Sequence, residues 1–207
     1  MSEDRKTLDL ILRSAEAEFL EKGFQNASLR TIVKNAGVTT GAFYRYYSSK
    51  EALFSALVEP HAAYIMHIFI SAIEDWNNFS DDDKIVRMTE LSTAGIDKML
   101  DYIYEHYSAF KLLVCSAGGS MYEDFIHDIV EADVDSTLHC AEILRGMGHQ
   151  VPELDKDFIH MICSALFSGI FEIVAHDMDK ADATRRVHQL RDFFTGGWSR
   201  IMNCSFG

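Results

Sequence analysis

The sequence predicts an all-α protein in which a small N-terminal three-helix domain continues into a larger helical bundle, with about nine helices in total. Three observations support this prediction. Apolar residues recur at helical spacing along most of the chain, only two of the 207 residues are proline, and no stretch alternates apolar and polar residues as a half-buried strand does. Because 48% of the residues are hydrophobic, the chain can bury a substantial core.

Charge divides the chain into two parts. Residues 1–50 hold eight Lys and Arg against six Asp and Glu, whereas residues 51–207 hold eleven against 26, and the net charge is −13. Phosphate groups require compensating cations, so the acidic part is a poor candidate for binding nucleic acid. We therefore expect two domains with different partners, residues 1–50 and residues 51–207.

The first fifty residues predict three helices separated by tight turns. Gly23 ends the first helix, Ser28 caps a two-turn second helix, and Gly37 ends that helix in the left-handed conformation that glycine adopts most easily. Thr39 caps a short third helix over residues 40–46. The apolar positions of the first helix recur every three or four residues: Leu8, Ile11, Leu12, Ala15, Phe19 and Leu20.

Longer helices follow. Ser48 and Glu51 predict a capping box at the start of the fourth helix. Pro60 has no N–H to bond the carbonyl of Ala56, so this helix should kink or end there. The remaining helical patterns cover residues 61–77, 81–106, 108–116, 121–147, 155–177 and 182–202.

Two short helices joined by a glycine-containing turn predict a helix-turn-helix, whose second helix lies in the major groove of DNA. Hydroxyls and phenols suit phosphate oxygens and base edges, and cations suit phosphate or guanine. Lys50 begins the fourth helix, where backbone N–H groups already favour an anion, so we expect it to bind a phosphate. Phe43 and Tyr47 should turn inward. The expected DNA contacts are Ser28, Arg30, Thr39, Thr40, Gly41, Tyr44, Arg45, Tyr46 and Lys50.

The run from Ala17 to Leu57, which contains EFLEKGFQNASLRTIVKNAGVTTGAFYRYYSSKEALFSAL, resembles the N-terminal domain of the tetracycline-repressor (TetR) family. The matching features are an aromatic-glycine loop, a two-turn helix, a G-V-T-x-G turn, an F-Y-x-Y-Y block and K-E-x-L-F. Val33 and Tyr47 stand where the family usually has Ala and Phe, and both keep the core apolar. The resemblance implies a regulator, most simply a repressor, that binds a palindromic double-stranded DNA operator as a homodimer and is released by a small-molecule effector.

The same resemblance implies that the last two helices form a four-helix dimer interface, and the sequence supports it independently. Two apolar stripes with small residues at their centres permit close helix approach. The penultimate helix is apolar nearly all round, so it needs two neighbours. The expected interface residues are Phe158, Ile162, Ala165, Gly169, Ile173, Val187, Leu190, Phe194, Trp198 and Ile201.

The remaining helices are expected to enclose a pocket for the effector, because they combine apolar bulk with a few polar groups. The candidate lining residues are Tyr64, His67, Met88, Met99, Tyr102, Ile103, Phe110, Leu113, Phe125 and His139. Each of them taken singly also suits an ordinary core position. The acidic composition of this part favours cationic or neutral effectors over anionic ones.

No metal or cofactor is expected. Asp124, His127, Asp128 and Glu131 share one helical face, and His160 precedes Cys163 by three residues, but neither group has the spacing of a closed ligand set. The sequence also lacks G-x-S-x-G, H-E-x-x-H, Walker and dinucleotide motifs, so we expect no enzyme activity. Two alternatives stay open: a metal- or redox-responsive regulator on the same scaffold, and a helical ligand-binding or enzymatic protein that no longer binds DNA.

The expected location is the cytoplasm. The start, MSEDRKTLDLIL, lacks the continuous apolar stretch of a signal peptide, and no window approaches the ~20 apolar residues of a membrane span. The cysteines lie within helical patterns and contain no C-x-x-C, as expected of reduced, buried thiols: Cys115, Cys140, Cys163 and Cys204.

Overall fold

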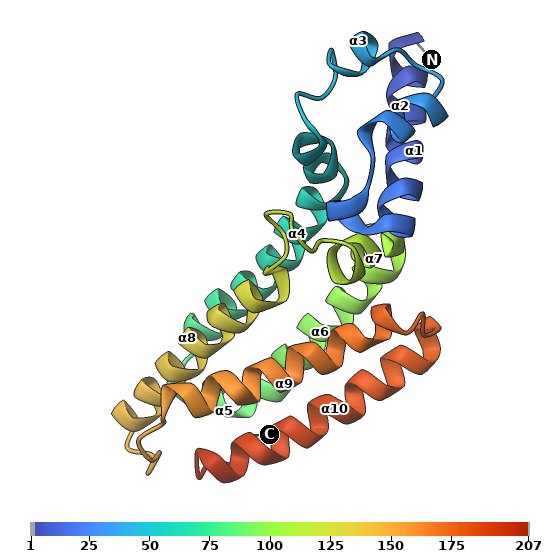
Figure 1. Ribbon diagram of the computed structural model, residues 1–207. Helices are drawn as coiled ribbons and strands as arrows, with labels where there is room; N and C mark the ends of the chain where they lie inside the picture. The colour runs from blue at the N-terminus through green and yellow to red at the C-terminus, as the bar shows by residue number, and fades with distance from the viewer. Residues whose placement is uncertain (1–2, 207) are drawn as a thin grey trace. The chain divides into compact units, whose positions relative to one another are not determined.

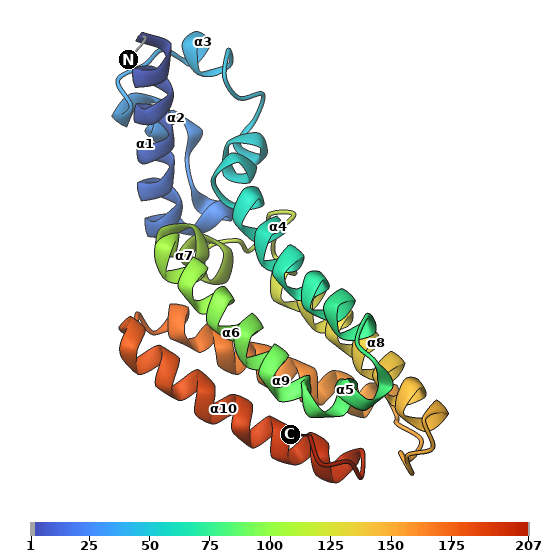
Figure 2. The same ribbon diagram turned by 180° about the vertical axis from the view of Figure 1, so that it is seen from behind.

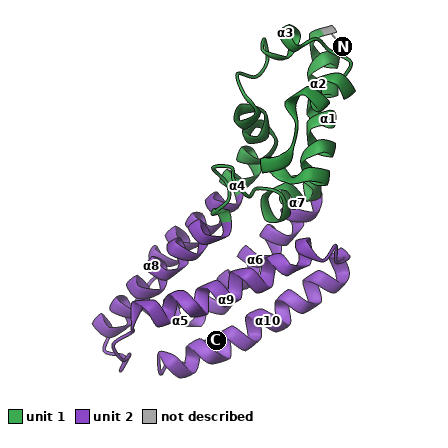
Figure 3. Cartoon of the chain, in the orientation of Figure 1, with its two compact units in different colours: residues 1–64, 106–125 green, residues 65–105, 126–207 purple. Residues whose placement is uncertain are grey.

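The computed structural model describes residues 3–206, and within that range the chain forms ten helices and no strand (Figure 1). The all-α prediction is confirmed. The helix count exceeds the expected nine because the pattern over residues 81–106 is two helices, α5 (Asp81–Val86) and α6 (Met88–Glu105). These helices form two compact units (Figure 3). Unit 1 comprises residues 1–64 and 106–125, and unit 2 comprises residues 65–105 and 126–207.

Unit 1 contains α1 (Glu3–Asn26), α2 (Leu29–Asn35), α3 (Thr40–Phe43), the first part of α4 (Lys50–Asn77) and α7 (Tyr107–Cys115). Three phenylalanines form its centre: the ring of Phe54 lies 5.0 Å from that of Phe19 and 5.1 Å from that of Phe24. α7 packs on α1, and the N–H of Phe24 donates to the carbonyl of Ser116 at 2.7 Å. Unit 1 extends to residue 64 and also includes α7, which supplies part of its core. The boundary expected after residue 50 therefore falls inside unit 1.

The turns of unit 1 follow the expected signals with one exception. Gly23 leaves the helical conformation with φ 71° and ψ 161°, and Gly37 has φ 69°. At the start of α4, however, the hydroxyl of Ser49 accepts the hydrogen bond from the N–H of Ala52 at 3.1 Å. The capping box predicted for Ser48 and Glu51 is therefore wrong by one residue, since α4 begins at Lys50.

Pro60 lies inside α4, which continues unbroken to Asn77 (Figure 2). The expectation that the helix ends at Pro60 is therefore wrong, whereas the alternative of a kink within one helix stays a prediction. Pro60 is exposed, so the carbonyl that lacks its N–H partner has access to water rather than being buried unpaired. One uninterrupted helix consequently carries residues of both units.

Unit 2 contains the rest of α4, α5, α6, α8 (Phe125–Gly146), α9 (Lys156–Ala175) and α10 (Lys180–Ile201). α9 and α10 lie side by side in both views, and α10 also packs on α6 (Figures 1 and 2). Asp155 and Asp179 cap α9 and α10 through their carboxylates. One end of the unit is closed by a buried cluster: Trp76, Cys140, Ala141, Leu144, Val151, Met202 and Cys204.

Two helices, α4 and α9, reach the length and apolar composition of a membrane span, contrary to the sequence-based expectation. This is weak evidence for a span, because the core helix of a globular protein meets the same criteria. α9 places seven residues in the interior of unit 2, and these account for much of its apolar character: Ile159, Cys163, Phe167, Ile170, Phe171, Ile173 and Val174.

Candidate functional site

The second helix of the helix-turn-helix, α3, is fixed from behind and exposed in front. The hydroxyl of Thr39 accepts from the N–H of Ala42 at 3.1 Å, which caps the helix as predicted. Phe43 is fully buried and holds α3 against the core. The expected contact residues on the outer side are exposed, and Tyr44 is 54% exposed: Thr39, Thr40, Gly41, Tyr44 and Arg45. A rigid backbone thus presents hydroxyl, phenol and guanidinium groups to the solvent.

The start of α2 is built around Ser28. Its hydroxyl accepts from the N–H of Thr31 at 3.3 Å, and its own N–H donates to the buried carboxylate of Glu18 at 3.0 Å. Arg30, the second residue of α2, is exposed. Ser28 is therefore a capping residue in the first place, whereas Arg30 is positioned on the surface as expected.

Tyr46 connects α3 to the first turn of α1. Its hydroxyl lies 3.2 Å from the carboxylate of Asp4, and partial burial together with this bond raises the pKa of the phenol. The contact joins the segment after α3 to the first turn of α1, which also carries the exposed Arg5 and Lys6. Sequence reasoning missed these two cations, because only the tertiary contact shows that α1 begins next to α3. Tyr47 is half-buried and its ring lies 6.0 Å from that of Phe43.

Lys50 has a different role from the expected one. Its ammonium donates to the carbonyls of Phe24 at 2.8 Å, Gln25 at 3.2 Å and Ala27 at 3.2 Å, and lies 4.6 Å from the centre of the Phe24 ring. A lysine has three N–H donors, so these bonds can use all three at the C-terminal end of α1 and at Ala27 directly after it. The structure thus gives Lys50 a role in holding this end of α1 that the sequence did not indicate, while its assignment to a DNA phosphate stays a prediction.

Unit 2 contains two adjoining cavities of about 220 and 200 Å³. The first lies among α4, α6, α8 and α9, and the second among α6, α8, α9 and α10. Both are predominantly apolar, and they share seven lining residues: Met88, Ser92, Ile96, Asp133, Ser136, Cys140 and Leu166. The two cavities therefore adjoin each other along these shared residues inside unit 2.

Asp133 is the one carboxylate that lines both cavities. Burial raises its pKa to about 6, and a hydrogen bond from the thiol of Cys163 opposes that rise. The hydroxyl of Thr89, in the wall of the second cavity, is buried and has no hydrogen-bond partner in the described part of the chain. These groups place an acceptor and an unsatisfied hydroxyl in walls that are otherwise mostly apolar but include Arg191 in the second cavity.

Of the ten predicted pocket residues, Met88 and Met99 line these two cavities and the other eight do not. Ile103 is fully buried in the core of unit 2, while His67 and His139 are exposed. Tyr102 is half-buried in unit 2 but lies outside both linings. The other four belong to unit 1 and therefore do not line these cavities: Tyr64, Phe110, Leu113 and Phe125. Apolar character alone did not distinguish a wall from a core.

The stripes predicted for a dimer interface are used partly inside the chain. Ile173 and Val187 are buried, and a Cβ added at Gly169 would lie 2.9 Å from Cδ2 of Leu190, so Gly169 serves the contact between α9 and α10. Phe194 and Trp198 line the second cavity. Ile162 and Ile201 are half-buried, and Ala165 is exposed. The large apolar side chains left on the surface of these helices are Phe158, Met161 and Phe193, at 47%, 69% and 75% exposure.

The buried thiols of unit 2 are held in the protonated form. Burial raises the pKa of Cys140 to about 12, and burial also raises the pKa values of Cys163 and Cys204. Cys115, in unit 1, is exposed, contrary to the expectation of four buried thiols. Since thiolates are the reactive species, the three buried cysteines give no support to a redox-responsive regulator.

Residues 11–57 match the family model described as bacterial regulatory proteins, tetR family. The HTH-type regulator YdgC of Bacillus subtilis is 46% identical over 56 residues, 27% of each chain. The HTH-type transcriptional repressor NemR of Escherichia coli is 29% identical over 116 residues, 56% of this chain and 48% of NemR. The chain thus spans between about a quarter and a half of these relatives' lengths.

Solved structures share the fold along nearly the whole chain. A transcriptional regulator from Aquifex aeolicus has a TM-score of 0.57 and 17% identity, covering 91% of this chain and 99% of its own. A TetR-family regulator from Syntrophomonas wolfei has a TM-score of 0.56 and 20% identity, covering 93% and 95%. Residues 11–57 thus match the DNA-binding domain of the tetR family, and the chain as a whole shares the all-α fold of these solved regulators.

Proposed function

We propose that this protein is a ligand-responsive repressor that acts in the cytoplasm, binds a palindromic operator as a homodimer and is released by a small-molecule effector. The observation that carries the proposal is the outer side of α3, where Thr40, Tyr44 and Arg45 are exposed on a helix that Phe43 fixes from behind. An exposed phenol next to a guanidinium matches the hydrogen-bonding needs of phosphates and base edges. Arg5, Lys6 and Arg30 add cations on the same unit.

The proposed operator binding is tested by selecting binding sites from random double-stranded DNA and footprinting the sequence that binds most tightly. Two recognition helices related by two-fold symmetry reach half-sites whose centres are about 34–36 Å apart, so the selected site should be an inverted repeat with that spacing. Two chains should occupy it. A single half-site protected by one chain would refute the dimeric mode, and no sequence enrichment at all would refute operator binding.

The homodimer is proposed to use the exposed face of α9 and α10, which keeps Phe158 of the expected stripes and adds Met161 and Phe193. Phe158, Met161 and Phe193 leave apolar area on neighbouring helices that nothing in the described chain covers. Phe193→Glu should convert the dimer into a monomer in analytical ultracentrifugation. Phe69→Glu is unsuitable as a control because its side chain lines the cavity, whereas Val86→Glu replaces an exposed apolar residue away from α9 and α10 and should leave the dimer intact.

The effector is proposed to occupy the adjoining cavities of unit 2. Each is below the ~300–1,000 Å³ typical of ligand pockets, but together they reach that range. In the first cavity Asp133 is the one charged residue among the described lining residues, which favours a lipophilic cation or a neutral hydrogen-bond donor there and disfavours an anion. The second cavity is also lined by Arg191, whose guanidinium pairs with Asp192. α4 contributes Ile65, Phe69 and Trp76 to the wall of the first cavity, and this same helix begins at Lys50 in unit 1.

A panel of lipophilic cations and matched lipophilic acids, screened by thermal shift, tests this effector class. Stabilisation by cations should be lost in Asp133→Asn and kept in Asp135→Asn, which changes an exposed carboxylate on the same helix. Stabilisation by acids, unaffected by Asp133→Asn, would contradict the proposed class while leaving DNA binding untouched.

A further inference from the structure

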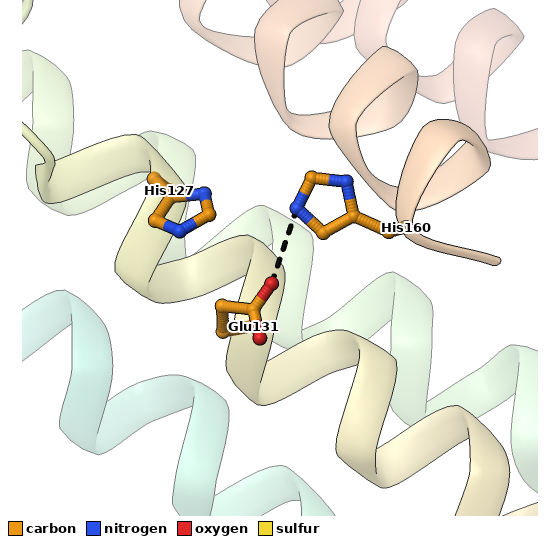
Figure 4. Close-up of side chains that lie close together, drawn as sticks. All are labelled: His127, Glu131 and His160. Atoms are coloured by element: carbon orange, nitrogen blue, oxygen red, sulfur yellow. Dashed lines mark ion pairs between the residues drawn. The ribbon is translucent and has the colours of Figure 1, made fainter. Parts of the chain in front are cut away.

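Unit 2 carries a cluster of potential metal ligands outside the cavities. His127 and Glu131 lie one turn apart on α8, and His160 lies near the start of α9 (Figure 4). One ligand atom from each residue lies within 4.8 Å of the others. The sequence showed His127 with Glu131 and His160 with Cys163 as separate groups. Tertiary packing joins the first pair to His160, whereas the thiol of Cys163 turns to Asp133.

The side chains in this cluster are already oriented toward one another. Nε2 of His160 lies 3.1 Å from Oε1 of Glu131, and the rings of His127 and His160 are 5.5 Å apart (Figure 4). On its far side, Nδ1 of His160 lies 3.4 Å from the hydroxyl of Ser164. Because Ser164 contacts Nδ1, the other ring nitrogen, Nε2, faces the cluster. In metal sites, a hydrogen bond to the nitrogen that does not bind the metal orients the imidazole in the same way.

The donor set selects the kind of ion. Two imidazoles and one carboxylate suit Zn²⁺ and similar transition metals, whereas Ca²⁺ and Mg²⁺ require mostly oxygen ligands. Zinc bonds of about 2.0–2.2 Å place neighbouring ligand atoms roughly 3.3–3.5 Å apart in a tetrahedron. Side-chain rotations that close the cluster by about 1 Å would satisfy this geometry. The site is accessible, since the side chains of His160 and Glu131 are 36% and 42% exposed.

We propose that His127, Glu131 and His160 bind one Zn²⁺ ion, or a divalent transition metal of similar preference, and so clip α8 to α9. Three protein ligands leave the fourth position open to water or to another donor. Both helices contribute to the cavity walls, through Asp133 on α8 and Leu166 on α9. The ion would therefore stabilise the walls of the ligand cavity. Because the cluster lies within unit 2, zinc binding does not depend on the proposed DNA-binding function.

The competing explanation is an ordinary histidine–carboxylate ion pair with a second histidine close by. The chain offers a matched control in Glu172, near the end of α9, and His176, directly after its last residue, which form such a pair at 2.7 Å. Among the described residues, no third ligand of the kind present in the cluster accompanies this pair. His176→Gln should therefore leave zinc binding unchanged, while His160→Gln and His127→Gln should weaken it.

The test uses tag-free full-length protein and zinc chloride alone, with stoichiometry measured by titration calorimetry and confirmed by Co²⁺ absorption in the visible range. We expect one ion per chain, affinity lowered about tenfold or more in His160→Gln and His127→Gln, and no change in His176→Gln or Cys115→Ser. Zinc should raise Tm in the wild type and not in the His160 variant. No zinc binding at ~100 μM, or equal binding in the wild type and both cluster variants, would overturn the proposal. If His160→Gln fails to fold, His127→Gln alone decides.

Discussion

Replacing Lys50 by Met should destabilise unit 1, because three backbone carbonyls lose their donor at once. The ammonium lies 2.8–3.2 Å from the carbonyl oxygens of Phe24, Gln25 and Ala27. A hydrogen bond to a charged group contributes about 1.5–3 kcal/mol, but the bond to Gln25 is exposed and water can replace it in part. The cation above the Phe24 ring adds roughly 0.5 kcal/mol. We expect a loss of about 3 kcal/mol in the free energy of unfolding.

The assay is urea unfolding at a fixed protein concentration, because the apparent stability of a dimer depends on concentration. Lys34→Met is the matched control: Lys34 is an exposed lysine at the end of α2, and its loss should change stability by no more than about 0.5 kcal/mol. If Lys50→Met were equally harmless but flattened the salt dependence of DNA binding, the reasoning would be refuted. Lys50 would then be the phosphate ligand first expected from the sequence.

Thr39→Ala removes the cap of α3 and should cost about 1 kcal/mol in urea unfolding, together with a loss of operator affinity; unchanged stability would mean that the 3.1 Å cap is not formed in solution. Gly169→Ala places a Cβ 2.9 Å from Leu190 and should cost about 1–3 kcal/mol, and Leu190→Ala in the same chain should relieve part of that cost; additive losses would count against the contact. Pro60→Ala should preserve the fold while changing the ratio of operator affinities with and without effector. An unchanged ratio would show that Pro60 has no part in coupling the two activities.

The features that depend on neighbouring residues in the sequence could be predicted. Ser28 and Thr39 are caps, and Gly37 has positive φ, because each of these roles is decided within one turn of the chain. The exposed side of α3 could be predicted for the same reason, since Phe43 and Tyr44 follow from helical spacing.

Features that depend on residues distant in the sequence could not be predicted. The sequence predicts that Lys50 binds a phosphate. Only the fold shows that the carbonyls of Phe24 and Ala27 accept hydrogen bonds from its ammonium. His160 is 29 positions from Glu131, so no spacing motif connects them. The pocket was misplaced because Phe110 and Ile103 have the apolar character of a cavity wall but fill a core instead. Residues that line a cavity and residues that fill a core show the same apolar periodicity in a sequence.

DNA binding by the exposed side of α3 is tested most directly by the affinity of Arg45→Ala for the selected operator. This affinity is measured by fluorescence anisotropy across a range of salt concentrations. Arg186→Ala is the control, because Arg186 is an exposed arginine on α10 that pairs with Asp182. We expect Arg45→Ala to weaken operator binding by about 1–3 kcal/mol, either uniformly with a shallower salt slope or with relaxed specificity at one base pair. We expect Arg186→Ala to bind like the wild type. Wild-type affinity and salt slope in Arg45→Ala and in Tyr44→Ala would contradict DNA binding by this side of α3.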